Sequence, residues 1–117
     1  MKIVINRCFG GFGLSHEAIL KYAAAAGISM VVVDKNPESK WLRYEYYKDS
    51  ISDENFWSEY QLDRTDPSLV KIVEQMGKDS WGDAAELKVV EIPDGVNWHL
   101  SEYDGIEHVA EYHRTWS

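Results

Sequence analysis

The sequence predicts an α/β fold of the α+β class: a single domain over residues 1–117, with a mainly antiparallel sheet of about five strands and two helices packed on one face. Two segments with apolar residues at helical spacing, each beginning at a capping residue, predict the helices. Short segments rich in β-branched and aromatic residues, separated by glycine and proline turns, predict the strands. An Asp-Gly turn at 104–105 between two such segments predicts a hairpin.

Both predicted helices have clear ends. Ser15 is a favourable N-cap for a helix at 16–26, and Gly27 supplies the left-handed residue that ends it. Asp66 followed by Pro67 is a favourable start for the second helix, whose apolar residues recur at i, i+3, i+4 and i+7.

Six segments are predicted as strands. The first two flank a helix, an order that suits a parallel βαβ unit, and an antiparallel arrangement with an intervening strand also fits. The last segment also has the spacing of a short helix, but the Asp-Gly turn before it favours a strand. The segments are Lys2–Cys8, Ile28–Asp34, Tyr44–Tyr47, Ala85–Ile92, Val96–Glu102 and Ile106–Tyr112. The exposed edge of the hairpin would permit a homo-oligomer.

Composition and charge exclude several classes of function. The formal net charge of -8 opposes binding to nucleic acid, which needs clustered Lys and Arg, and it suits a basic protein partner. No apolar run approaches the roughly 20 residues that span a membrane, and no signal-peptide core is present. The single cysteine, Cys8, excludes an internal disulfide and a cysteine zinc cluster. We therefore expect a cytoplasmic protein without a membrane segment.

A glycine-rich turn between the first strand and the first helix is the leading candidate for a ligand site. Backbone N–H groups at a helix N-terminus, with a nearby hydroxyl, suit a phosphate or nucleotide. Arg7 and Arg64 would add positive charge if the fold brings them to the turn. The predicted ligand-binding residues are Arg7, Gly10, Gly11, Phe12, Gly13, Ser15 and Arg64.

The same turn also has a purely structural interpretation. Gly11-x-Gly13 resembles the start of a dinucleotide fingerprint, but His16 stands where that fingerprint needs glycine. No lysine follows the glycines, so the turn is not a P-loop. A tight strand-to-helix turn with Phe9 and Phe12 in the core is the simpler interpretation of these residues.

A second candidate surface combines aromatic and acidic side chains in the middle of the chain. Around the predicted strand at 44–47, we expect an acidic loop near 49–55 and a short strand or turn at 56–62. Aromatic rings with carboxylates suit a basic protein partner or a stacked base, and they also suit a small satellite core. The alternative partner-binding residues are Tyr44, Tyr46, Tyr47, Trp57, Arg114 and Trp116, with Asp49, Asp53, Glu54 and Glu59 as the acidic component.

Catalytic and metal chemistry have weak support. The four histidines and neighbouring carboxylates show no ligand spacing, so we expect no metal. Cys8 beside the turn is a candidate nucleophile with His16 as its base, but a free cysteine in a strand is usually a small buried hydrophobe. We predict no catalytic residue and no cofactor.

Distinctive sequence motifs occur at both ends of the chain, with a shorter one in the middle. The matching residues are Ile5 to Phe12 with Leu14-Ser15, then Asp63-Arg64 and Asp66-Pro67, and finally 87–93, Trp98, Tyr103-Asp104-Gly105, Glu107, Val109, Glu111 and 113–116. In these residues, about half of the chain, the sequence resembles a family of small, largely uncharacterised proteins of bacteriophages and prophages. The resemblance implies expression in the cytoplasm of an infected bacterium and an accessory role, such as interference with host defence.

Three functions follow as hypotheses. The first is a non-enzymatic phage accessory protein that sequesters an anionic, nucleotide-like ligand at the glycine-rich turn. The second is an acidic inhibitor that binds a host defence protein through the aromatic and acidic region. The third is a small nucleotide-processing enzyme that uses Cys8 or a histidine.

Overall fold

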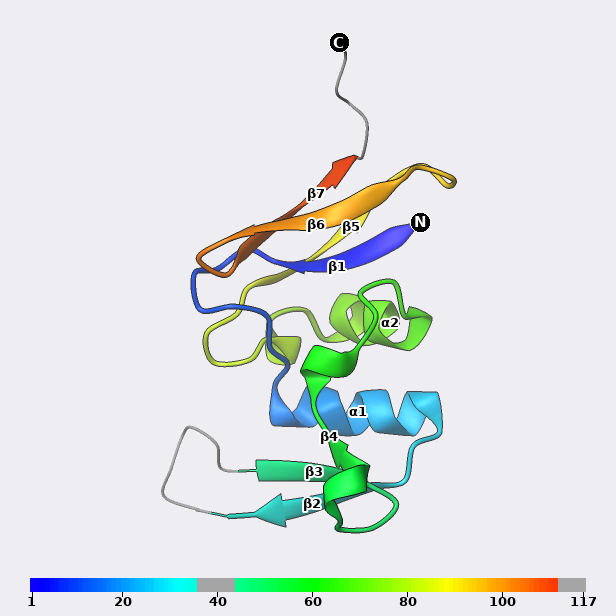
Figure 1. Cartoon of the computed structure of the whole chain (residues 1–117), viewed down its shortest axis with the longest axis vertical. Helices are drawn as coiled ribbons and strands as arrows, with labels where there is room; N and C mark the ends of the chain where they lie inside the picture. The colour runs from blue at the N-terminus through cyan, green and yellow to red at the C-terminus, as the bar shows by residue number, and fades with distance from the viewer. Residues whose placement is uncertain (36–43, 112–117) are drawn as a thin grey trace.

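Two helices separate two groups of strands in the computed structural model, which describes residues 1–35 and 44–111 (Figure 1). The helices, α1 (His16–Ala26) and α2 (Pro67–Met76), pack against each other. On the α2 side lie β1 (Lys2–Asn6), β5 (Leu87–Glu91), β6 (Trp98–Tyr103) and β7 (Ile106–Glu111). On the α1 side lie β2 (Met30–Asp34), β3 (Tyr44–Lys48) and β4 (Phe56–Trp57). Three short 3₁₀ turns complete the description: η1 (Asp53–Asn55), η2 (Glu59–Gln61) and η3 (Gly77–Ser80).

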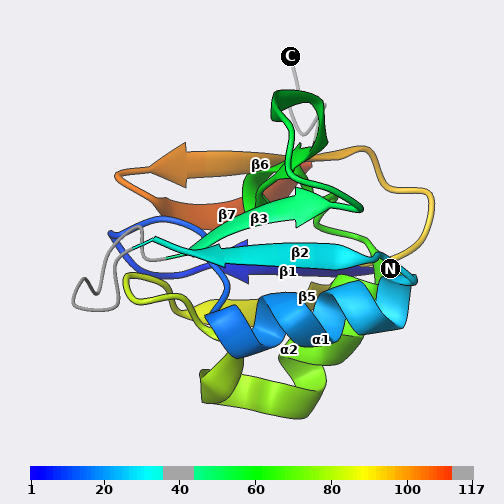
Figure 2. The same ribbon diagram turned by 90° about the horizontal axis from the view of Figure 1, so that it is seen from below.

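The strand pairing confirms a single small α+β domain with antiparallel sheets. β1 pairs with β5, β2 with β3 and β3 with β4, and β6 pairs with β7, all antiparallel. The strands nevertheless form three small sheets instead of one, and the helices separate the β2–β3–β4 sheet from the other two (Figure 1). Seen from below, the strands of the two groups overlap, and both helices lie to one side of them (Figure 2). The predicted hairpin is confirmed, and its second arm is a strand and not a helix.

The expected parallel βαβ unit does not form, because β1 has no free edge for β2. One edge of β1 carries β5, with Ile3 opposite Val90. At the other edge, the amide of Val4 donates to the carbonyl of Arg64 at 2.9 Å. The chain after α1 therefore runs on the far side of the helix pair, where β2 pairs with β3.

The strand β1 ends at Asn6, two residues earlier than predicted, because beyond this point the Asn6 side chain takes up backbone groups that a longer ladder would pair. Its amide nitrogen donates to the carbonyls of Cys8 and Gly105, both at 2.7 Å. Its side-chain oxygen accepts from the amides of Cys8 and Glu86. Asn6 is fully buried, so this one side chain joins the glycine-rich turn, the segment before β5 and the hairpin turn.

The helix ends are confirmed. The Ser15 hydroxyl accepts from the Ala18 amide at 3.2 Å, and Gly27 ends α1 with φ 72°. The Asp66 carboxylate accepts from the Ser68 amide at 2.9 Å, as the N-cap of α2 requires.

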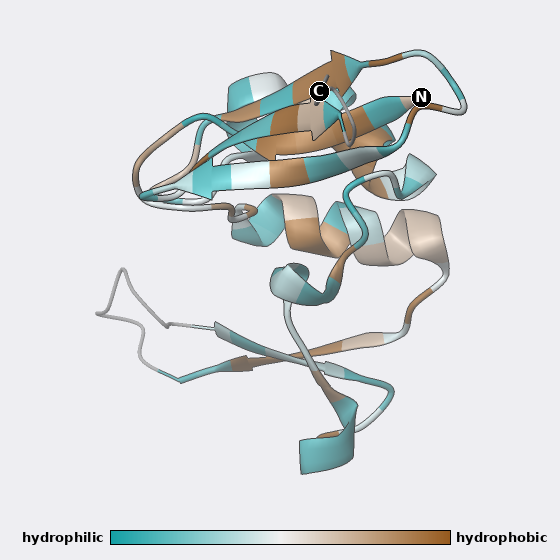
Figure 3. Ribbon diagram, turned by 45° about the horizontal axis from the view of Figure 1, so that its top comes forward, coloured by the Kyte–Doolittle hydropathy of each residue, from teal (hydrophilic) through white to brown (hydrophobic). Residues whose placement is uncertain are grey.

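The hydrophobic core lies between the layers. Its buried members come from β1, the end of the glycine-rich turn, both helices, β4 and the start of β5. In Figure 3 the acidic turn η1, at the outer end of the β3–β4 connection, has the hydrophilic colour. The region between β3 and η2 is therefore attached to the core mainly through Trp57 and partly buried Tyr46.

Candidate functional site

The glycine-rich turn is held by close approach of other backbone segments. A Cβ at Gly10 would lie 2.1 Å from the Ala84 Cβ, so this glycine is required by packing. Across the same junction, a Cβ at Gly105 in the hairpin turn would lie 2.5 Å from the Phe9 carbonyl oxygen. Gly11 instead adopts φ 92° with open space around it. The packing supports a structural role for the turn and places Phe12 in the core, but the prediction was wrong for Phe9, whose side chain is 69% exposed.

The two arginines bind the hairpin and do not line the pocket beside the turn. The Arg64 guanidinium forms a two-pronged ion pair with Glu107, at 2.5 and 2.9 Å, where the side chains are only 17% and 10% exposed. The same guanidinium lies 3.7 Å from the centre of the Phe12 ring. Arg7 donates to the Glu107 carbonyl at 2.9 Å. Of the predicted ligand set, Gly10, Gly11, Phe12 and Gly13 line that pocket, and Arg7, Ser15 and Arg64 do not.

The pocket beside the turn, here called the glycine pocket, has acidic walls. It encloses about 290 Å³ and is lined by Gly10–Leu14, Glu59, Tyr60 and 82–84. The Glu59 carboxylate accepts from the Leu14 amide at 3.1 Å, at the place where an anionic ligand would meet the turn. The Ser15 hydroxyl donates to the Asp79 carbonyl at 2.6 Å while it caps α1. A second carboxylate, Asp83, also lines the pocket, so its charge does not suit a phosphate.

A second hollow, here called the aromatic–acidic pocket, lies between β3, β4 and η2. It encloses about 360 Å³, and it shares Glu59 and Tyr60 with the glycine pocket. Its lining residues are Lys35, Tyr44, Glu45, Tyr46, Phe56, Trp57, Ser58, Glu59 and Tyr60. Two of the rings are well exposed, Phe56 at 50% and Tyr60 at 75%, so aromatic surface is open to a partner.

Ring contacts fix the inner wall of this pocket. The Tyr46 and Trp57 rings meet edge to face, with centroids 6.2 Å apart, because Tyr46 lies opposite Trp57 in the β3–β4 register. The Tyr44 ring stacks on His16 at 3.8 Å, and the His16 Nδ1 lies 2.7 Å from the Tyr46 hydroxyl. Trp57 also stacks near Tyr22 of α1. The wall is thus anchored to α1 before any ligand binds.

The titratable groups of the wall share a poorly solvated environment. Burial raises the pKa of Glu59 above its ordinary value of 4.5, although the Leu14 amide favours the charged form. Burial, followed by the charge of Glu59 and the neighbouring Tyr44, raises the pKa of Tyr46. A carboxylate beside open aromatic rings attracts a cation, whose charge would offset the burial that opposes ionised Glu59.

The outer edge of the pocket carries an ion pair. Lys35 binds the Glu45 carboxylate, which also accepts from the Tyr47 hydroxyl at 2.6 Å. The hydrogen bond from Lys35, followed by that from Tyr47, lowers the pKa of Glu45. The Tyr47 ring itself packs edge to face on Phe56 and does not line the pocket.

The structure brings together three of the predicted partner-binding residues, Tyr44, Tyr46 and Trp57. Arg114 and Trp116 lie outside the described residues. Phe56, Tyr60 and Lys35 were not predicted, and Glu59 was predicted only as part of a general acidic surface. The aromatic residues that flank Glu59 in 56–60 were the available signal, but the turn at η2, which orients Glu59 and Tyr60, cannot be placed from periodicity.

Groups suited to metal binding do not assemble in the described ranges. No cluster of three or more His, Cys, Asp or Glu that could hold a metal occurs in residues 1–35 and 44–111. Cys8 is partly buried beside Asn6. His16, the predicted base for Cys8, hydrogen-bonds Tyr46 and stacks on Tyr44.

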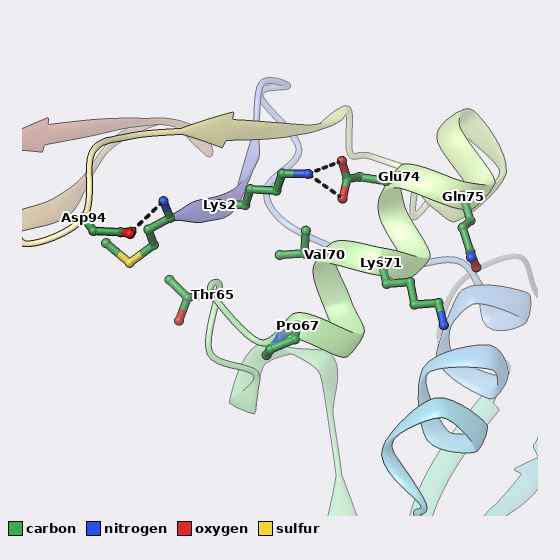
Figure 4. Close-up of a pocket in the computed structure, with 9 residues that line it drawn as sticks. Lys2, Thr65, Pro67, Val70, Lys71, Glu74, Gln75 and Asp94 are labelled. Atoms are coloured by element: carbon green, nitrogen blue, oxygen red, sulfur yellow. Dashed lines mark hydrogen bonds and ion pairs between the residues drawn. The ribbon is translucent and has the colours of Figure 1, made fainter.

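A broader groove of about 760 Å³ lies on the opposite side of the helix pair (Figure 4). Figure 4 shows Val70 and Pro67 of α2 beneath two ion pairs, Lys2 with Glu74 and the N-terminal amine with Asp94. None of the predicted site residues lines it.

Comparisons with known proteins found no matching family model, curated protein or solved structure. Among the described residues, neither helix has the length and apolar character that crossing a membrane would require.

Proposed function

We propose that the protein is a non-enzymatic phage accessory protein that binds a basic segment of a host protein through the aromatic–acidic pocket and thereby inhibits that protein. One observation supports this proposal above all. Exposed aromatic rings and the partly buried carboxylate of Glu59 line the same pocket of about 360 Å³. The phage setting comes from the resemblance of the two chain ends.

A lysine or arginine side chain is the occupant that this chemistry favours. Cation–π contacts with Tyr and Trp contribute about 0.5–2 kcal/mol each, more where water is excluded. The carboxylate of Glu59 adds a charge-assisted hydrogen bond. The formal net charge of -8 steers a basic partner toward the surface and raises its association rate.

Nucleotide sequestration at the glycine-rich turn has less support. A phosphate in the glycine pocket would face Glu59 and Asp83, while the guanidinium of Arg64 is already neutralised by Glu107. Like charges of this kind oppose an anion by several kcal/mol when they are desolvated. The basic-partner proposal needs no rearrangement of these groups.

The test is calorimetric titration of the protein with hexa-arginine and hexa-lysine peptides, with hexa-glutamate as the charge control and a panel of linear and cyclic nucleotides alongside. We expect binding of the two basic peptides only. The double variant Glu45→Gln with Glu59→Gln should weaken the affinity at least about tenfold, the loss expected when charged hydrogen-bond acceptors are neutralised.

A matched control distinguishes the pocket from net charge. Glu86 and Glu91 are exposed carboxylates at or beside β5, in the other strand layer. The double variant Glu86→Gln with Glu91→Gln removes the same charge, and it should retain nearly the wild-type affinity. Equal losses in both double variants would reduce the interaction to general electrostatics and overturn the proposal, and binding of a nucleotide in place of the peptides would restore the sequestration hypothesis.

A further inference from the structure

Lys35 places a cation at the acidic edge of the aromatic–acidic pocket. It is the one basic residue among the described residues that line this pocket. Its ammonium group binds Glu45, and Glu45 has no other cationic partner among the interactions described for it. The side chains of Lys35 and Glu45 are 54% and 28% exposed, so the pair is accessible from solvent.

We propose that Lys35 is an internal competitor: its ammonium group occupies the position that the basic side chain of a partner takes when it binds. This inference rests on the proposed function. It adds that the acidic edge of the pocket is already paired in the free protein, and that a partner must displace Lys35 from Glu45 before it gains this edge.

The contacts of Glu45 support displacement over simultaneous binding. One carboxylate oxygen binds Lys35 and the other accepts from the Tyr47 hydroxyl at 2.6 Å. An incoming guanidinium needs both oxygens for two parallel hydrogen bonds. Tyr47 is held by its ring contact with Phe56, and the oxygen that it binds keeps a second lone pair, so the guanidinium requires only Lys35 to leave.

The strength of the ion pair also suits a competitor. Exposed pairs contribute little to stability, so a partner can replace Lys35 at small cost. Lys35 directly follows β2, and its long flexible side chain can leave the pocket while the β2–β3 ladder stays intact. The competing cation thus lowers the affinity of the pocket for weakly basic segments more than for strongly basic ones. The pocket thereby becomes selective for strongly basic segments.

The experiment is calorimetric titration of hexa-arginine into three variants and the wild type. Lys35→Gln should bind the peptide more tightly, by up to about fivefold, the factor expected for one exposed ion pair. Lys48→Gln removes the same charge from the exposed end of β3, outside the pocket, and it should tighten binding much less. Lys35→Arg keeps a cation against Glu45, and its affinity should match the wild type.

A second readout follows the displaced group itself. In the wild type, hexa-arginine should shift the NMR signal of the Lys35 ammonium or its adjacent methylene toward that of a solvated lysine. The same peptide should leave the corresponding signal of Lys48 unchanged.

Each outcome decides the inference. Equal or weaker binding by Lys35→Gln than by Lys48→Gln, when the wild type binds the peptide, overturns the competitor role and leaves the proposed function standing. If Lys35→Arg bound hexa-arginine as tightly as Lys35→Gln does, this result would also contradict the competitor role, because a cation at position 35 would then have no effect on the affinity. Failure of every protein to bind the basic peptides overturns both proposals.

Discussion

At the scale of single residues, two partly or fully buried carboxylates have opposite roles. Glu107 is matched by the Arg64 guanidinium and by the Asn6 amide at 2.8 Å, so its charge is used by the fold. Glu59 receives the Leu14 amide, yet its pKa is raised, so burial opposes its charged form. A charge that the fold does not need, beside open aromatic rings, is the residue-scale argument for a binding role.

The variant Glu59→Gln should therefore be more stable than the wild type at pH 7. A raised folded-state pKa means that the folded protein prefers protonated Glu59, so stability is fully present below pH 4.5 and is lost as the pH rises through the folded-state pKa. Glutamine keeps the hydrogen bond to Leu14 without the charge. Urea denaturation at several pH values checks this: the gain should disappear below about pH 4, and a Glu59→Gln variant less stable at pH 7 would contradict it.

The glycines of the turn give the second residue-scale prediction. Gly10→Ala should destabilise the protein by about 3 kcal/mol or more, because the new Cβ would overlap Ala84. Gly11→Ala should cost only about 1 kcal/mol, the strain of an alanine with positive φ, since nothing lies within 4 Å. Denaturant midpoints of the two variants measure the difference. Equal stabilities would show that backbone packing does not explain the turn.

At the scale of elements, the sequence predicted what local chemistry determines. Both helices, their caps at Ser15 and Asp66, and the hairpin at Asp104-Gly105 follow from residues within a few positions of one another. The division of the strands among three sheets depends on long-range contacts, such as that of Arg64 with Val4, which no local pattern contains.

For the candidate site, too, the sequence predicted the local composition, and the long-range contacts appeared only in the structure. The aromatic and acidic composition of the 44–60 region indicated a recognition surface, and Tyr44, Tyr46 and Trp57 do meet there. The glycine-rich turn indicated an anion site because glycine serves equally for close approach to a ligand and to another backbone. Only the structure shows that Ala84 is the neighbour of Gly10 and that Arg64 is bound to Glu107.

The hairpin β6–β7 gives the element-scale prediction. Glu107 of β7 ties this hairpin to the rest of the fold. Its carboxylate pairs with Arg64, in the segment before α2, and accepts from the backbone amide of Asn6 in β1. Glu107→Gln should lower the free energy of unfolding by about 3 kcal/mol, because it leaves the guanidinium of Arg64 largely buried without a counter-charge. Urea denaturation measures the loss, with exposed Glu86→Gln as a control expected to change stability by less than about 0.5 kcal/mol. A loss of equal size in both variants would show that the pair does not hold the hairpin.

At the scale of the whole molecule, the helix pair separates a layer joined by buried polar contacts from a layer that holds the proposed binding pocket. The layer of β1, β5 and the hairpin is joined by the ion pair and by the buried Asn6. The layer of β2, β3 and β4 carries open aromatic rings and unbalanced acidic charge. The overall charge of -8 and the local chemistry of the second layer therefore favour the same kind of partner.

The most direct test of that claim is an amide NMR titration of the isotope-labelled protein with hexa-arginine. The account predicts saturating shifts confined to β3, β4, η2 and Lys35, weakened by added salt because the contact is ionic. Shifts confined instead to α2 and the groove at Val70, or a complete absence of shifts with hexa-arginine, would contradict the assignment of the aromatic–acidic pocket as the binding site.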